Sequence, residues 1–247
     1  MCGRKQLWLP LAVILCAVAA FGQKHPSDAA LTAQIEDKLY HARVFQHGQV
    51  QFAFSDGVAT LSGTVDSIGV KWDAERALRK VDDVLRVIDN LNVSTEDVTP
   101  RQIVEKARHE ILTYYAYGIF DWITLEIQGN ALMVSGQVSQ PFKKEDIGNF
   151  LAHIKGVTDL ENNLEVLPVS PYDDSLRIAI ARAIYNDPYF ISYANQPIPP
   201  IHIIVKNGNV TLEGVVATKL DHTKAENDAR LASTFFALTD NLRVEGK

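Results

Sequence analysis

The side chains that could perform chemistry in this sequence are chiefly its seven histidines and its 30 carboxylates. Histidines that bind zinc from one helix usually stand a fixed few residues apart, as in H-E-x-x-H. No pair of histidines here has such a spacing. His202 lies in a predicted strand and points away from its apolar face, and five others fall at polar helical or loop positions typical of solvated residues: His41, His47, His109, His153 and His222. We therefore expect no metal site and no cofactor.

Catalytic residues are not indicated either. Both cysteines, Cys2 and Cys16, lie in an N-terminal segment that we expect to be removed. The acid pairs Asp82-Asp83 and Asp173-Asp174 match helix-end and N-cap positions, where a carboxylate complements the helix dipole. The repeated glycines fall in hairpins and strands rather than at strand-to-helix turns, so they form no phosphate-binding loop. We expect no enzyme.

Aromatic side chains gather in two helix-to-strand connections, ILTYYAYGIFDW (111–122) and NDPYFISYANQPIPP (186–200). Aromatic rings with a polar tip suit a membrane interface or a protein partner. We expect a lipid- or partner-binding surface formed by seven residues: Leu112, Tyr115, Phe120, Trp122, Tyr189, Phe190 and Tyr193. The alternative is that these rings pack between adjacent units of the chain.

The connections belong to a pattern that occurs three times. A hairpin sequence appears as DGVATLSGTV (56–65), GNALMVSGQV (129–138) and NGNVTLEGVV (207–216). The turn pairs tolerate the positive φ of a tight hairpin, and apolar residues alternate along the strands. Each second strand contains a glycine that is followed 27 residues later by Asn-Leu-x-Val: Gly63 with Asn90, Gly136 with Asn163, and Gly214 with Asn241. We expect a helix to approach the sheet closely at these glycines.

Helical periodicity flanks each hairpin. The preceding helices have apolar stripes such as Leu31/Ile35/Leu39, and the following ones have stripes such as Ile147/Leu151/Ile154. The fold class is therefore α+β, with three tandem small αββαβ sandwich domains, each a three-stranded sheet covered on one face by two helices. Proline and polar residues interrupt both periods between the units, which we place at residues 28–94, 100–167 and 172–245.

This pattern resembles the BON domain of bacterial envelope proteins, such as osmotically inducible periplasmic proteins. The resemblance rests on the helix, the DGxxTLSGTV hairpin, the second helix and the NLxV strand, in three tandem copies from about residue 28 to 245. It implies a non-enzymatic envelope protein that associates with phospholipid.

The N-terminus predicts a secretory signal peptide at residues 1–22. Arg4 and Lys5 precede an apolar run from Leu7 to Ala20, and small residues follow. The alternatives are an uncleaved anchor, disfavoured by the short run, and lipid attachment at Cys16, disfavoured by the bulky residues before it. Removal of the segment leaves 22 basic and 30 acidic residues, a net charge of −8, which argues against nucleic acid as a partner.

Two functions remain from these observations. The first is a periplasmic or secreted protein, peripheral to the outer membrane, that binds a phospholipid surface in envelope or osmotic stress maintenance. The alternative is a periplasmic protein–protein scaffold or stress-protective binding module. Residues 95–167 carry six basic and 11 acidic side chains, so an anionic lipid surface repels this part unless aromatic insertion outweighs the charge.

Overall fold

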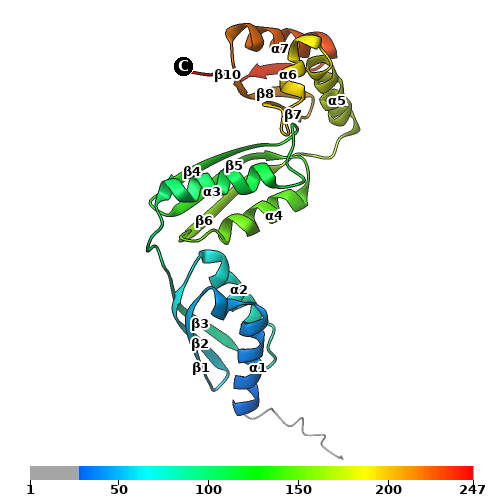
Figure 1. Cartoon of the computed structure of the whole chain (residues 1–247). Helices are drawn as coiled ribbons and strands as arrows, with labels where there is room; N and C mark the ends of the chain where they lie inside the picture. Colours follow the sequence, from blue (N-terminus) through cyan, green and yellow to red (C-terminus); the bar gives the residue numbers. More distant parts are fainter. Residues whose placement is uncertain (1–27, 247) are drawn as a thin grey trace, which may run out of the picture.

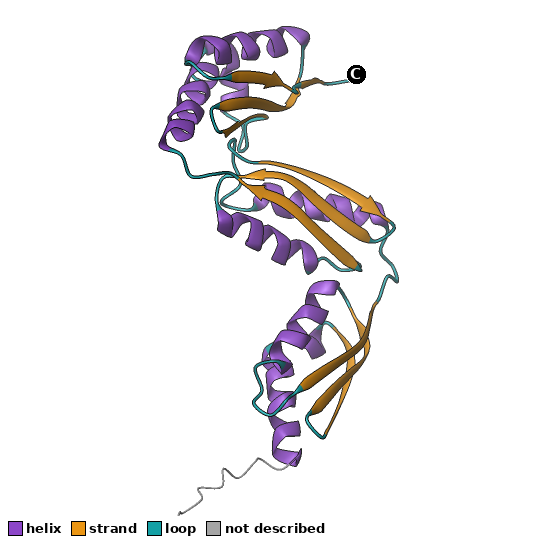
Figure 2. Cartoon of the chain, turned by 180° about the vertical axis from the view of Figure 1, so that it is seen from behind, coloured by secondary structure: helices purple, strands orange, loops and turns teal. Residues whose placement is uncertain are grey.

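The computed structural model describes residues 28–246. The predicted signal peptide at residues 1–22 lies outside the described residues. Three α+β units follow one another along an elongated molecule, and in each of them the helices pack on one face of a small sheet (Figures 1 and 2). The α+β class is confirmed. Within residues 28–246, no helix combines the length and the hydrophobicity needed to cross a membrane.

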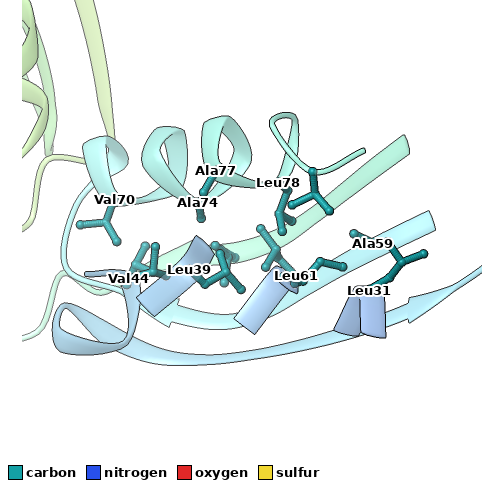
Figure 3. Packing of buried hydrophobic residues seen from close by; sticks show 13 residues of the cluster. Leu31, Leu39, Val44, Ala59, Leu61, Val70, Ala74, Ala77 and Leu78 are labelled. Atoms are coloured by element: carbon teal, nitrogen blue, oxygen red, sulfur yellow. The ribbon is translucent and has the colours of Figure 1, made fainter. Parts of the chain in front are cut away.

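Unit one has the predicted element order. Its elements are α1 (Asp28–His41), β1 (Gly48–Ser55), β2 (Val58–Val65), α2 (Ile68–Leu78) and β3 (Arg86–Val93), with a 3-10 turn at Val44–Gln46. β2 is the central strand, antiparallel to β1 and parallel to β3, because α2 carries the chain back before β3 begins. Figure 3 shows Leu31 and Leu39 of α1 meeting Leu61 of β2 and Leu78 of α2.

Unit two repeats this order and this sheet. Its elements are α3 (Pro100–Thr113), β4 (Trp122–Gln128), β5 (Ala131–Val138), α4 (Pro141–Ala152) and β6 (Asp159–Val166). α3 begins where it does because Thr99 and Gln102 form a reciprocal capping box around Pro100 in the first turn. The buried stripe of α3 is the predicted one, Ile103, Ala107 and Ile111.

Unit three departs from the other two at two places. Its elements are α5 (Pro171–Tyr185), a 3-10 turn (Pro188–Phe190), α6 (Ile191–Ala194), β7 (Ile201–Lys206), β8 (Asn209–Val216), α7 (Lys219–Ala232), β9 (Ala237–Asp240) and β10 (Arg243–Val244). The expected single last strand is instead two, β9 and β10, interrupted at Asn241 and Leu242. β9 and β10 are both parallel to β8, so the path of the chain is the same as in the other units.

The three strand glycines do not have the expected role. Gly63, Gly136 and Gly214 have φ of +120°, +122° and +129°, and a Cβ there would lie 1.9–2.0 Å from a carbonyl oxygen of the neighbouring strand or of the residue just before it. The close approach is therefore made by backbone within the sheet and not by a helix, which corrects the prediction. A side chain is excluded both by the φ value and by the lack of space.

Candidate functional site

The seam between units one and two, defined by residues 66–73 and 153–157, combines backbone hydrogen bonds with the packing of Ile68 against the core of unit two. The Ile68 amide donates to the Val157 carbonyl at 2.9 Å, and the Gly156 amide donates to the Asp66 carbonyl at 2.8 Å. These bonds join the start of α2 to the loop that follows α4. Each unit thus supplies a donor and an acceptor, which fixes the position of one unit on the other.

His153 reinforces this first seam. Its Nε2 lies 2.9 Å from Oδ2 of Asp73 in unit one, and its Nδ1 lies 2.7 Å from the Asn149 carbonyl. The first contact reaches across the seam, and the second stays within the same helix end. Gly69 leaves room for the ring, since a Cβ there would lie 2.6 Å from Nδ1. His153 is exposed, as expected, but sequence periodicity contains no information about its partner Asp73 in the neighbouring unit.

The seam between units two and three is made by the loop at residues 114–121 and by the strand β7. The amide of Ile203 in β7 donates to the Ile119 carbonyl at 2.7 Å. β7 is an edge strand of its sheet, so this bond covers part of an edge that is otherwise free to pair with another chain. Phe120 packs against the hydrophobic core of unit three. Lys206 and Glu165 form an ion pair on the outside of the same seam.

His202 lies in the second seam. Its side chain points away from the core of unit three, as expected, but unit two covers it and leaves it 5% exposed. Its ring centroid is 5.6 Å from that of Tyr117 and 5.1 Å from that of Trp122. Burial lowers the pKa of His202, while the backbone of Gly118 and Asp121 and the charge of Asp121 act in the opposite direction.

A buried ion pair holds the loop of this second seam in place. Asp121 is fully buried, and its Oδ2 accepts from Lys143 Nζ at 2.7 Å and from the Gly118 amide at 3.0 Å. Oδ1 accepts from the amide and the hydroxyl of Ser139 at 2.8 and 2.9 Å. Sequence reasoning missed Asp121 and Lys143, because neither position has a periodic or motif signal.

The structure separates the four site residues predicted in unit two. Leu112 and Tyr115 are 48% and 86% exposed. Phe120 and Trp122 instead pack against unit three. The expectation that all four are exposed together is therefore wrong, and the alternative of packing between units holds for Phe120 and Trp122.

The three aromatic residues predicted in unit three mainly attach the inserted segment to α7. The hydroxyls of Tyr189 and Tyr193 donate to the two carboxylate oxygens of Asp221, at 2.5 and 2.8 Å. Burial by itself raises the pKa of Asp221, but these bonds and those from Thr218 outweigh it, and the pKa is lowered. Phe190 is fully buried in the core, which corrects its assignment to a binding surface, whereas Tyr189 remains 42% exposed.

One cluster in unit three has the side chains of a metal site, although the sequence analysis predicted none. His222, Glu226 and Asp240 each offer a ligand atom, and these atoms lie within 4.8 Å of one another. His222 and Glu226 are one helical turn apart on α7, and Asp240 ends β9. The signal available in the sequence was this four-residue spacing, but the third residue comes from a distant element.

Comparisons with known proteins agree with the repeated architecture. The BON domain matches residues 27–95 and 173–246, and no match to it covers unit two. No curated protein matches the chain. Two solved structures of CdsD, a structural protein of the type III secretion system of Chlamydia trachomatis, are similar to it. One, described as the C-terminal domain, has 14% identity over 84% of this chain and 96% of that chain, with a TM-score of 0.26.

The second CdsD structure has 16% identity over 87% of this chain and 91% of that chain, also with a TM-score of 0.26. Likenesses of this size carry no conclusion about function. The family match is different in kind, because its two segments together span more than half of the sequence and coincide with units one and three. The chain therefore belongs to the BON domain family.

Proposed function

We propose that this protein is a non-enzymatic scaffold of the bacterial cell envelope, whose three docked units present a binding surface for another envelope protein. The observation that supports this most directly is the second seam. There Phe120 of unit two enters the core cluster of unit three, and Ile119 bonds to the edge strand β7. Units that only served as separate binding modules would not need to share a core residue.

Membership of the BON family and the signal peptide predicted at residues 1–22 support a place in the envelope or periplasm. Beside the second seam, the open face of the third sheet forms a hollow of about 430 Å³. Most of the residues that line it have polar side chains, among them Lys206, Asn207, Asn209, Thr211 and Asn241. A partner surface rich in hydrogen-bonding groups fits such a lining better than a lipid chain does.

The test places a photo-crosslinking residue at the exposed position Asn209 and looks for adducts in intact cells. The variant Phe120→Ser/Trp122→Ser should loosen the second seam and lose the adduct. The matched variant Leu112→Ser/Tyr115→Ser removes as many apolar side chains from unit two, away from that seam, and should keep it. A discrete adduct that persists in the seam variant would contradict the scaffold.

Association with a phospholipid surface is the second candidate, with a role in envelope or osmotic stress maintenance. The observation in its favour is that Leu112 and Tyr115 are both exposed near the end of α3. Burying two such side chains in the membrane interface contributes roughly 3–6 kcal/mol by area. Because residues 95–167 are net acidic, salt should screen repulsion from anionic lipid and strengthen binding.

Liposome flotation of the mature chain against salt tests this candidate. Binding that rises with salt and is lost in Leu112→Ser/Tyr115→Ser, but not in Tyr189→Ser, would place the membrane contact on unit two. Absence of flotation at every salt concentration would exclude the lipid candidate and leave the scaffold.

A further inference from the structure

At one position of the fold, the three units have different pairs of charged or polar side chains. It lies between the first turns of the second helix and the last strand. Eight residues after the strand glycine the chain has Lys71, Lys144 and His222, and 26 residues after it Asp89, Asn162 and Asp240. The strand register confirms the equivalence, since the last three pair with Leu61, Val134 and Leu212 at the same point of the central strand.

Units one and two satisfy this position with their own side chains. In unit one, Lys71 Nζ lies 3.2 Å from Oδ2 of Asp89 and donates to the Leu91 carbonyl at 2.7 Å. In unit two the acid is absent, and the neutral Asn162 donates to the Lys144 carbonyl at 2.9 Å. Neither unit therefore leaves a negative charge without compensation at this place.

Unit three keeps the aspartate, Asp240, but has His222 where unit one has Lys71. Asp240 Oδ1 accepts from the Leu242 amide, but Oδ2 is buried and accepts no hydrogen bond from any described residue. The side chain of Asp240 is 11% exposed, and Oδ2 faces Nε2 of His222 at 3.4 Å. A buried carboxylate oxygen that accepts no hydrogen bond is costly, and unit three has only the imidazole of His222 where unit one has the ammonium group of Lys71.

The side chains around Asp240 suit a metal ion, which would supply the positive charge. Donor atoms around a tetrahedral zinc ion, with bonds of about 2.0–2.2 Å, lie roughly 3.3–3.6 Å apart. The distance of 3.4 Å between His222 and Asp240 already meets this requirement. Glu226 lies one turn further along α7, with its ligand atom within 4.8 Å of the other two. Arg230 bonds to Oε1 of Glu226, which leaves Oε2 as the oxygen to turn inward.

We propose that His222, Glu226 and Asp240 form a site for a divalent transition metal of the zinc type. One imidazole nitrogen and two carboxylate oxygens are ligands that zinc accepts, whereas calcium and magnesium prefer oxygen alone. Three protein ligands leave a fourth position for water. The ion ties α7 to the end of β9 and does in unit three what the Lys71 ammonium does in unit one.

The experiment titrates Zn²⁺ into the mature chain by calorimetry and follows thermal unfolding at the same metal concentrations. Two variants copy the sister units: His222→Lys brings in the lysine of unit one, and Asp240→Asn brings in the amide of unit two. His41→Gln is the matched control, because it removes an exposed histidine that also lies 3.4 Å from a carboxylate, that of Asp37. Circular dichroism verifies that every variant is folded.

We expect one equivalent of Zn²⁺ to bind the wild-type chain and to raise its unfolding temperature, with Ca²⁺ and Mg²⁺ giving no such shift. Both unit-three variants should bind Zn²⁺ at least about tenfold more weakly, since even outer-shell changes at metal sites have effects of that size. His41→Gln should bind as the wild type does. Absence of Zn²⁺ binding in the wild type, or binding retained in either unit-three variant, would overturn the site.

Discussion

At the scale of single residues, the three strand glycines were recognised from the repeat, but the reason for their presence was predicted wrongly. Period two places Gly63, Gly136 and Gly214 on the inner face, where a helix passes. The space they leave is filled by a carbonyl oxygen of the adjacent chain segment, and their φ values lie in a region that favours glycine. Alternation gives the direction of a side chain, but it does not give the backbone angle.

The first prediction concerns Gly136. Gly136→Ala should lower the free energy of unfolding of unit two by about 1–3 kcal/mol, because alanine at this φ is strained and its Cβ would meet the Trp122 carbonyl. Gly118→Ala is the control, since a Cβ at Gly118 meets nothing within 4 Å. Urea denaturation of both variants measures the difference. Equal stability of the two would show that the glycine is not required.

The second prediction compares two lysines that pair with acids. Lys143→Met leaves Asp121 buried and unneutralised, and should cost about 3–5 kcal/mol. Lys206→Met removes an exposed ion pair across the second seam and should cost less than about 1 kcal/mol. Thermal unfolding monitored by circular dichroism distinguishes them. A small loss in Lys143→Met would mean that water reaches Asp121 and that the loop is not held by this pair.

At the scale of elements, the loop at residues 114–121 links the stability of two units. It covers the edge strand β7 and encloses His202 between Tyr117 and Trp122. Charging a buried imidazole is unfavourable, and Asp121, whose charge acts on this ring, is already paired with Lys143. The burial of His202 should therefore make the stability of the second seam depend on pH.

The third prediction follows from the lowered pKa of His202. The unfolded chain binds a proton at the ordinary pKa of about 6.5, before the folded chain does. Stability of the second seam should therefore be complete above that pH, fall as the pH decreases below it, and level off below the lowered pKa of the folded form. His202→Gln should reduce this pH dependence of unfolding. An unchanged pH profile in that variant would assign the dependence to another group.

At the scale of the whole molecule, each seam joins a hydrophobic side chain of one unit to the core of the next: Ile68 to the core of unit two, and Phe120 to the core of unit three. The first seam adds reciprocal backbone bonds and the contact of His153 with Asp73. Unit one has a complete core of its own (Figure 3). Unit three lacks one of its core contacts, that from Phe120, when unit two is removed.

The fourth prediction uses fragments. Residues 24–97 should fold alone with a cooperative urea transition, because their core is self-contained. Residues 169–247 should be less stable than the same unit in the full chain by roughly 1.5–3 kcal/mol or more, the contribution of one buried large side chain. A molten 24–97 fragment, or a 169–247 fragment with undiminished stability, would show that the units depend on each other differently.

The residues that each helix and strand turns toward its own core could be predicted from the sequence. The stripes Leu31/Ile35/Leu39 and Ile103/Ala107/Ile111 are buried as predicted, and the repeated glycine-to-asparagine spacing indicated the BON family. Each of these signals is local, because an element must turn one face to its own sheet and that requirement imposes a period on the residues.

Only the tertiary structure decided what covers the outward faces. Phe120 and Trp122 look like exposed aromatics in sequence, and His153 and His202 look like solvated or outward residues, yet all four contact a neighbouring unit. The cluster of His222, Glu226 and Asp240 likewise joins residues from two elements. The physical reason is the same in each case: a contact between units, or between distant elements, requires one complementary arrangement in space and imposes no period along the chain.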